Sequence, residues 1–164
     1  MSRLIRDTDN IYKKARIKAS ESNDKLRSRE GASELLGVSA SSLLNYETGA
    51  CKQIPTDVIV KMSDIYNAPE LMNYYCCNEC LIGKYIAPQI EILDIDRITI
   101  QIIASLENVK TLKTELINIT ADGVIAEDEK PKLKYIVDTL DKISKEAQEL
   151  KLWTQKNLSK GLNK

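Results

Sequence analysis

Three of the four cysteines fall within five positions of one another, and their spacing is that of metal-binding thiols. Cys77 and Cys80 form a C-x-x-C pair, which can bind zinc or iron–sulfur clusters as thiolates. A closed site needs about four ligands, and beyond Cys76 only Cys51 remains to complete it. The alternative is that Cys76 and Cys80 lie on one helix and pack inward as small apolar side chains. We favour the packing role and expect neither a metal nor another cofactor.

Residues 118–129 have the spacing of a second kind of metal site. Oxygen-bearing side chains stand at the first, third and fifth places, glycine at the sixth and Glu129 at the twelfth, as in an EF-hand calcium loop. The alternative is an interhelical turn in which Asp122 and Gly123 reverse the chain and Asp128 caps the next helix. We favour the turn, because two of the first three ligands would be uncharged.

The composition argues against an enzyme and against a membrane protein. No histidine occurs, which removes the commonest general base and metal ligand. No apolar run is long enough to span a bilayer, and residues 1–10 are too polar for the core of a secretory signal. Cysteines in a chain without such a signal are typical of reduced thiols. We predict a soluble, cytoplasmic protein that is not an enzyme and has no membrane partner.

Charge is unevenly distributed although the net charge is zero. Residues 1–30 contain nine Lys or Arg against five acids, a surplus of four positive charges. A basic segment suits contact with phosphate groups. The alternative is a solvated helix face without a ligand, and charge alone favours neither.

The segment 28–49 has the pattern of two short helices joined by a tight turn. Gly37 ends the first helix, because a left-handed backbone there needs no Cβ. Ser39 is a favourable N-cap for the second helix, and Leu43 and Tyr46 bury that helix against the first. Four residues then occupy its outward face: Ala40, Ser41, Ser42 and Asn45.

The pattern Leu-Gly-Val-Ser-x-Ser-Ser-Leu-x-x-Tyr-Glu-x-Gly over residues 36–49 resembles the lambda-repressor-like regulators, also called the xenobiotic-response-element (XRE) family. Pro55, an apolar helix and a Tyr-Asn-Ala-Pro turn at 66–69 extend the resemblance, which covers about residues 8–75. It implies a five-helix domain whose second and third helices form a helix-turn-helix, with the third helix in the major groove of double-stranded DNA. The family, common in bacteria and their phages, implies a sequence-specific transcriptional regulator and a repressor.

Three features depart from the family pattern. Arg29 stands at the start of the second helix, where Gln commonly clamps a phosphate, and it can replace that contact as a cation. Gly31 and Ser33 occupy positions where better helix formers are usual, and the glycine costs up to about 1 kcal/mol. The outward face has neither Arg nor Gln, so Asn45 is its main candidate for reading adenine. The alternative is a scaffold or antagonist whose head no longer reads DNA.

The DNA contacts that we expect fall into two groups. The phosphate contacts are cationic: Arg16, Lys18, Arg27, Arg29 and Lys52. The residues at or near the base edges belong to the second helix of the pattern: Ser39, Ala40, Ser41, Ser42, Asn45 and Tyr46.

Beyond a boundary near residues 84–93, the sequence predicts long helices. Apolar residues over 95–119 follow a 3.6-residue period, which predicts one helix. Pro131 is tolerated only in a first turn, so the next helix should begin near Asp128 and run to about Asn157. Its apolar stripe has heptad spacing, typical of a coiled coil: Leu133, Ile136, Leu140, Ile143, Ala147 and Leu150.

We therefore predict an all-α protein in two parts. A five-helix lambda-repressor-like head occupies residues 1–85, and an antiparallel helical hairpin occupies residues 90–164. The apolar stripe of the hairpin exceeds what one facing helix can cover, which predicts a homodimer. A dimer would align two reading helices with half-sites about 34 Å apart. The alternative role for the hairpin is to bind a different protein partner.

Overall fold

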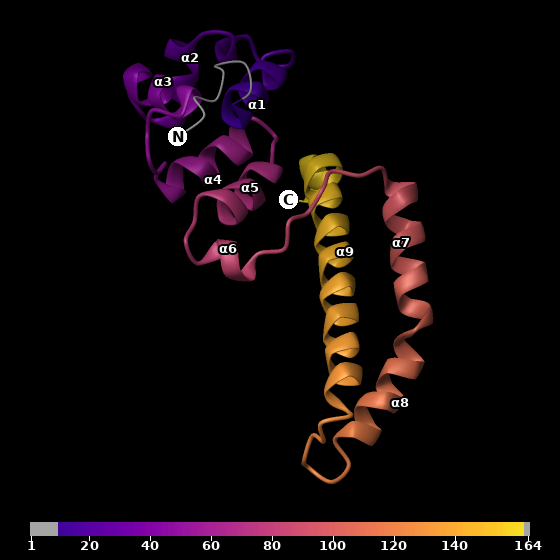
Figure 1. Cartoon of the computed structure of the whole chain (residues 1–164). Helices are drawn as coiled ribbons and strands as arrows, with labels where there is room; N and C mark the ends of the chain where they lie inside the picture. The colour runs from indigo at the N-terminus through magenta and orange to yellow at the C-terminus, as the bar shows by residue number, and fades with distance from the viewer. Residues whose placement is uncertain (1–9, 163–164) are drawn as a thin grey trace. The chain divides into compact units, whose positions relative to one another are not determined.

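A computed structural model describes the backbone of residues 10–162 and the side chains of residues 10–158. These residues form helices and no strand, so the all-α prediction is confirmed for this part of the chain (Figure 1). The chain divides into two compact units, the N-terminal unit Met1–Gln89 and the C-terminal unit Ile90–Lys164. Within the described residues, no helix combines the length and apolar character needed to cross a membrane.

The N-terminal unit is built from short helices around one core. In chain order they are α1 (Ile11–Ala19), the 3-10 helix η1 (Asp24–Leu26), α2 (Arg29–Leu36), α3 (Ala40–Thr48), α4 (Thr56–Ile65), α5 (Glu70–Asn78) and α6 (Gly83–Ile86). Almost every one contributes a fully buried side chain to the core, among them Leu26, Leu36, Leu43, Met62 and Leu71. Burial of these apolar side chains stabilises the short helices, which have only marginal stability in isolation.

The turn between α2 and α3 follows from its residues. Gly37 has a φ of 70°, the left-handed conformation that closes a helix and that glycine adopts without strain. Ser39 then accepts a hydrogen bond from the backbone N–H of Ser42 at 2.9 Å and so caps α3. Both local predictions are confirmed.

The C-terminal unit contains α7 (Ile95–Glu107), α8 (Val109–Ile119) and α9 (Lys130–Leu162), with α7 and α8 running back along α9 (Figure 1). The single helix predicted over 95–119 is wrong, because the helix is interrupted at Asn108. Asparagine is a weak helix former. Pro131 lies in the first turn of α9, as predicted, and this helix extends beyond the expected end.

The heptad stripe of α9 does not form one free face, which corrects the set of dimerisation residues. Ile136 is 1% exposed and packs with Leu112 and Ile119 of α8, so it belongs to the interior of its own unit. Leu133 and Ile143 are half-buried, whereas the other three are exposed: Leu140, Ala147 and Leu150. A straight helix drifts about 20° per heptad relative to a strict seven-residue repeat, so later members of the stripe turn away from the facing helix.

In the C-terminal unit, polar side chains occupy interior positions in place of exposed members of the heptad stripe of α9. Glu146 and Glu149 of α9 are 4% and 3% exposed, and Ser105 of α7 is 4% exposed. Glu149 accepts a hydrogen bond from the backbone N–H of Glu91 at 3.3 Å. One oxygen each of Gln101, Ser105 and Glu146 is buried without a hydrogen-bond partner. This interior is therefore less apolar than the sequence pattern predicts.

Candidate nucleic-acid interface

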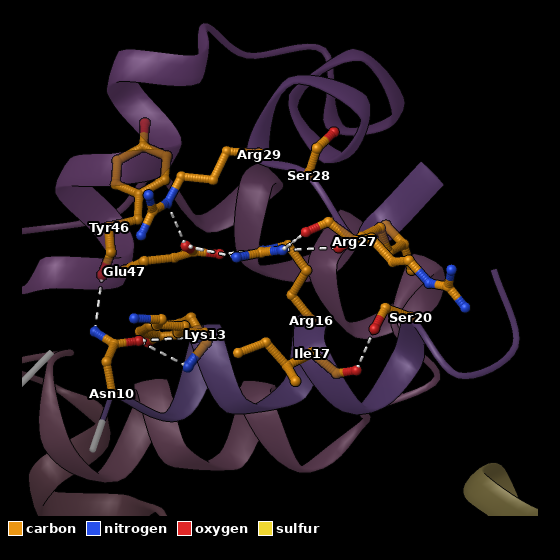
Figure 2. A network of polar contacts seen from close by, with 12 residues as sticks. Asn10, Lys13, Arg16, Ile17, Ser20, Arg27, Ser28, Arg29, Tyr46 and Glu47 are labelled. Carbon is orange, nitrogen blue, oxygen red and sulfur yellow. Dashed lines mark hydrogen bonds and ion pairs between the residues drawn. The ribbon is translucent and has the colours of Figure 1, made fainter. Parts of the chain in front are cut away.

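The position of α3 is fixed by one buried carboxylate on its inner side. Glu47 is fully buried, and its two oxygens pair with two arginines from other helices (Figure 2). Arg16 of α1 donates through Nε at 2.5 Å and through Nη2 at 3.1 Å, and Arg29 of α2 donates through Nε at 2.8 Å. A single side chain of α3 thus joins the two helices that support it.

Arg16 is a structural residue, which corrects its assignment as a phosphate contact. Its side chain is 5% exposed, and Nη1 donates to the backbone oxygens of Leu26 at 2.7 Å and Arg27 at 3.2 Å. The hydrogen bond donated to Glu47 raises the pKa of Arg16 above its usual value, against the opposing effect of burial. A guanidinium engaged in this way has no free edge for DNA.

Arg29 lies at the first position of α2 and differs from Arg16 in exposure. About a third of its side chain is accessible, 32%, and only Nε is used by Glu47. Among the described residues, its two Nη atoms have no hydrogen-bond partner. Arg29 therefore presents donors to solvent, while its Nε stays anchored on Glu47 (Figure 2).

The outward face of α3 presents few free polar groups. The hydroxyls of Ser39 and Ser42 lie 2.8 Å apart and serve the helix cap. Ser41 and Asn45 are exposed, and their side chains make no hydrogen bond with any described residue. Ala40 is half-buried. Ser41 and Asn45 are thus the side chains of this face that can hydrogen-bond to a ligand.

Tyr46 and Asn10 connect α3 to the start of α1. Tyr46 is half-buried against the core, and its backbone oxygen accepts a hydrogen bond from Nδ2 of Asn10 at 2.9 Å (Figure 2). The Oδ1 atom of Asn10 accepts from the N–H groups of Tyr12 and Lys13 and caps α1. Asn10 was not among the predicted caps, although asparagine directly before a helical segment is a recognisable N-cap signal.

The other cationic candidates lie on the surface. Lys18 of α1, Arg27 and Lys52 are exposed. Arg27 pairs with Asp24 at 3.1 Å, but both side chains are more than two-thirds exposed, so this pair contributes little to stability. These three side chains are accessible to a polyanion in a way that Arg16 is not.

Cys77 and Cys80 have hydrogen-bond partners within the protein. α5 ends at Asn78, so Cys80 lies beyond the helix on which we placed it, where its sulfur accepts from the N–H of Gly83 at 3.4 Å. Burial raises the pKa of Cys77, whose thiol donates to the backbone oxygen of Pro88 at 3.6 Å. Cys76 is partly buried. Over the described residues, no three His, Cys, Asp or Glu side chains are grouped to hold a metal ion.

In the segment 118–129, two carboxylates accept hydrogen bonds from backbone N–H groups of the same segment. Asp122 accepts from the N–H of Val124 at 3.0 Å, and Glu129 accepts from the N–H of Ala126 at 2.9 Å. Gly123 has a φ of 75° at the reversal of the chain. These contacts are those of an interhelical turn.

Comparison with protein families, with curated proteins and with solved structures found no match for this chain. What the outward face of α3 binds must therefore be inferred from its own geometry and charge.

Proposed function

We propose that the protein is a sequence-specific DNA-binding transcriptional regulator that acts as a homodimer in the cytoplasm. One observation carries the proposal: α3 exposes the free side chains of Ser41 and Asn45 while its inner side is anchored through Glu47. A preorganised helix with a free carboxamide can donate to and accept from an adenine edge in the major groove. Repression, rather than activation, is what the resemblance of residues 36–49 implies.

The exposed cations of the N-terminal unit supply the affinity in this proposal. The free Nη atoms of Arg29, together with Lys18, Arg27 and Lys52, contact phosphates and hold α3 against the groove. These contacts carry no sequence information, so Asn45 and Ser41 account for base discrimination. In this proposal α1 to α5 correspond to a five-helix lambda-repressor-like domain, to which η1 and α6 are additions, and the C-terminal unit corresponds to the hairpin that pairs it.

Replacing Asn45 with alanine should abolish discrimination at one position of the preferred site, at a cost of about 1–3 kcal/mol. Binding to random DNA should hardly change. The matched variant is Lys52→Ala, which should weaken all sequences alike and lower the salt slope by about one unit. Arg29 is a poorer control, because its replacement also removes a partner of Glu47. Fluorescence anisotropy with selected and random duplexes at several salt concentrations measures both effects.

The regulator proposal fails if the wild-type chain binds no duplex from a random library at about 50 mM salt, where phosphate contacts are strong. The scaffold or antagonist alternative would then account for the fold. In that case the exposed apolar residues of the C-terminal unit become the binding surface to study.

The dimer part of the proposal depends on α7, where three large apolar side chains are exposed. Ile100, Ile103 and Leu106 are 68%, 55% and 53% exposed, whereas Ile98 and Ser105 of the same helix are buried. Val137 and Leu140 of α9 are about half-exposed as well. A second copy brings the same apolar surface to a two-fold axis, which is the commonest way to cover such a face.

Light scattering should give about twice the 18.5 kDa of one chain at micromolar concentration. Ile103→Glu should shift the protein to a monomer, because a charge in an apolar interface is left unpaired. Ala121→Glu adds the same charge at an exposed position of the turn between α8 and α9 and should leave the dimer intact. A monomeric wild-type protein, or a dimer unaffected by Ile103→Glu, would exclude this interface.

A further inference from the structure

We propose that Leu44 is a further base-reading residue of α3, beside Asn45 and Ser41, and that it contacts the C5-methyl group of a thymine. The inference deepens the proposed function and rests on it: the DNA half-site would be A·T at the two positions facing Leu44 and Asn45. Leu44 is 40% exposed, whereas its neighbour Leu43 is fully buried, so only Leu43 belongs to the core.

The helical spacing places Leu44 on the outward face itself. Ser41 lies three positions before it and Thr48 four positions after it, which puts all three on one side of α3, next to Asn45. Ser41 and Asn45 are exposed like Leu44. An element that enters the major groove through this face must bring the Leu44 side chain to the base edges or the sugar-phosphate wall.

The polar groups of the face leave little means of reading a G·C pair. Guanine is read most often by Arg or Lys at its O6 and N7 atoms, and this face has neither. The hydroxyls of Ser39 and Ser42 serve the cap, and the Thr48 hydroxyl donates to the backbone oxygen of Leu44 at 2.9 Å. What remains is one carboxamide, one hydroxyl and the apolar surface of Leu44.

These groups match the major-groove edge of an A·T pair. Adenine offers N7 and the N6 amino group to the Asn45 carboxamide, and thymine offers the only methyl group among the four bases. Contact between Leu44 and that methyl removes apolar surface of both from water, which favours thymine over cytosine.

The experiment compares thymine with deoxyuridine, which keeps the hydrogen-bonding groups of thymine and lacks the methyl group. The full chain first selects a duplex from a random library, and each thymine of the recovered site is then replaced singly. At one position per half-site, we expect the Kd to rise about fourfold, the value for loss of one buried methyl group. Leu44→Ala should weaken binding to the thymine duplex and be insensitive to deoxyuridine at that position.

Val60→Ala is the matched control. Val60 is a half-exposed aliphatic residue of α4, which packs against α2 and α5, so its truncation should preserve the response to deoxyuridine. Circular dichroism should show that both variants keep the wild-type helix content, because neither side chain is buried.

Each outcome decides between defined possibilities. Loss of the methyl response in Leu44→Ala alone supports the proposal. Equal affinity for thymine and deoxyuridine at every position, or a methyl response that persists in Leu44→Ala, overturns the role of Leu44 and leaves DNA binding intact. If the selection recovers no duplex, the proposed function fails and this inference fails with it.

Discussion

Replacing Glu47 with alanine is expected to lower the free energy of unfolding by about 3–5 kcal/mol, the cost of breaking a buried ion pair. The loss comes mainly from Arg16, whose guanidinium stays in the core at 5% exposure and loses its counter-charge. Arg29 loses the same partner, but it is one-third exposed and can be solvated. Chemical denaturation followed by circular dichroism measures the change.

Two comparisons separate the effect of the charge from that of the missing side chain. The double variant Arg16→Met with Glu47→Leu removes both buried charges and should recover most of the stability, because apolar replacement of a whole pair is often neutral. Asp24→Ala breaks the exposed pair with Arg27 and should cost about 0–1 kcal/mol. A Glu47→Ala variant that loses no more than Asp24→Ala would show that the buried cluster does not hold α3 in place.

Local chemistry was enough to predict the turn on which the candidate interface depends. The left-handed conformation at Gly37 and the cap at Ser39 each involve residues no more than a few positions apart, so a single sequence contains both signals. The helical class of the chain follows in the same way from apolar spacing. The position of Asn45 on the outward face of α3 is a consequence of these local features.

Features that depend on distant partners could not be predicted in this way. The sequence predicts Arg16 as a phosphate contact from its charge alone. Its pairing with Glu47, 31 positions away, neutralises that charge and depends on the fold. The same limit applies to α9, where a regular heptad pattern does not determine which residues face α7. Glu146 is buried there although its type favours solvent.

For Gly31→Ala, the sequence and the structure predict opposite changes in stability. From helix propensity alone, Gly31→Ala within α2 should stabilise the protein by up to about 1 kcal/mol. The structure places η1 against α2 so closely that a Cβ at this position would lie 2.3 Å from the backbone oxygen of Lys25. Glycine at position 31 is therefore required by the close packing of η1 against α2. This packing explains why a better helix former is absent at this position.

We accordingly expect Gly31→Ala to destabilise the protein by about 1–3 kcal/mol, the range for overpacking a tight contact. The obstructing atom belongs to the backbone, so the clash cannot be relieved by rotating a side chain and must move η1 away from α2. That movement would also disturb the carbonyls of Leu26 and Arg27, which accept hydrogen bonds from Arg16. Glu34→Ala, at an exposed position of the same helix, is the control for propensity alone. Thermal and chemical denaturation measure the stability of the two variants relative to the wild type. If Gly31→Ala is as stable as the wild type or more stable, η1 and α2 are not packed as described.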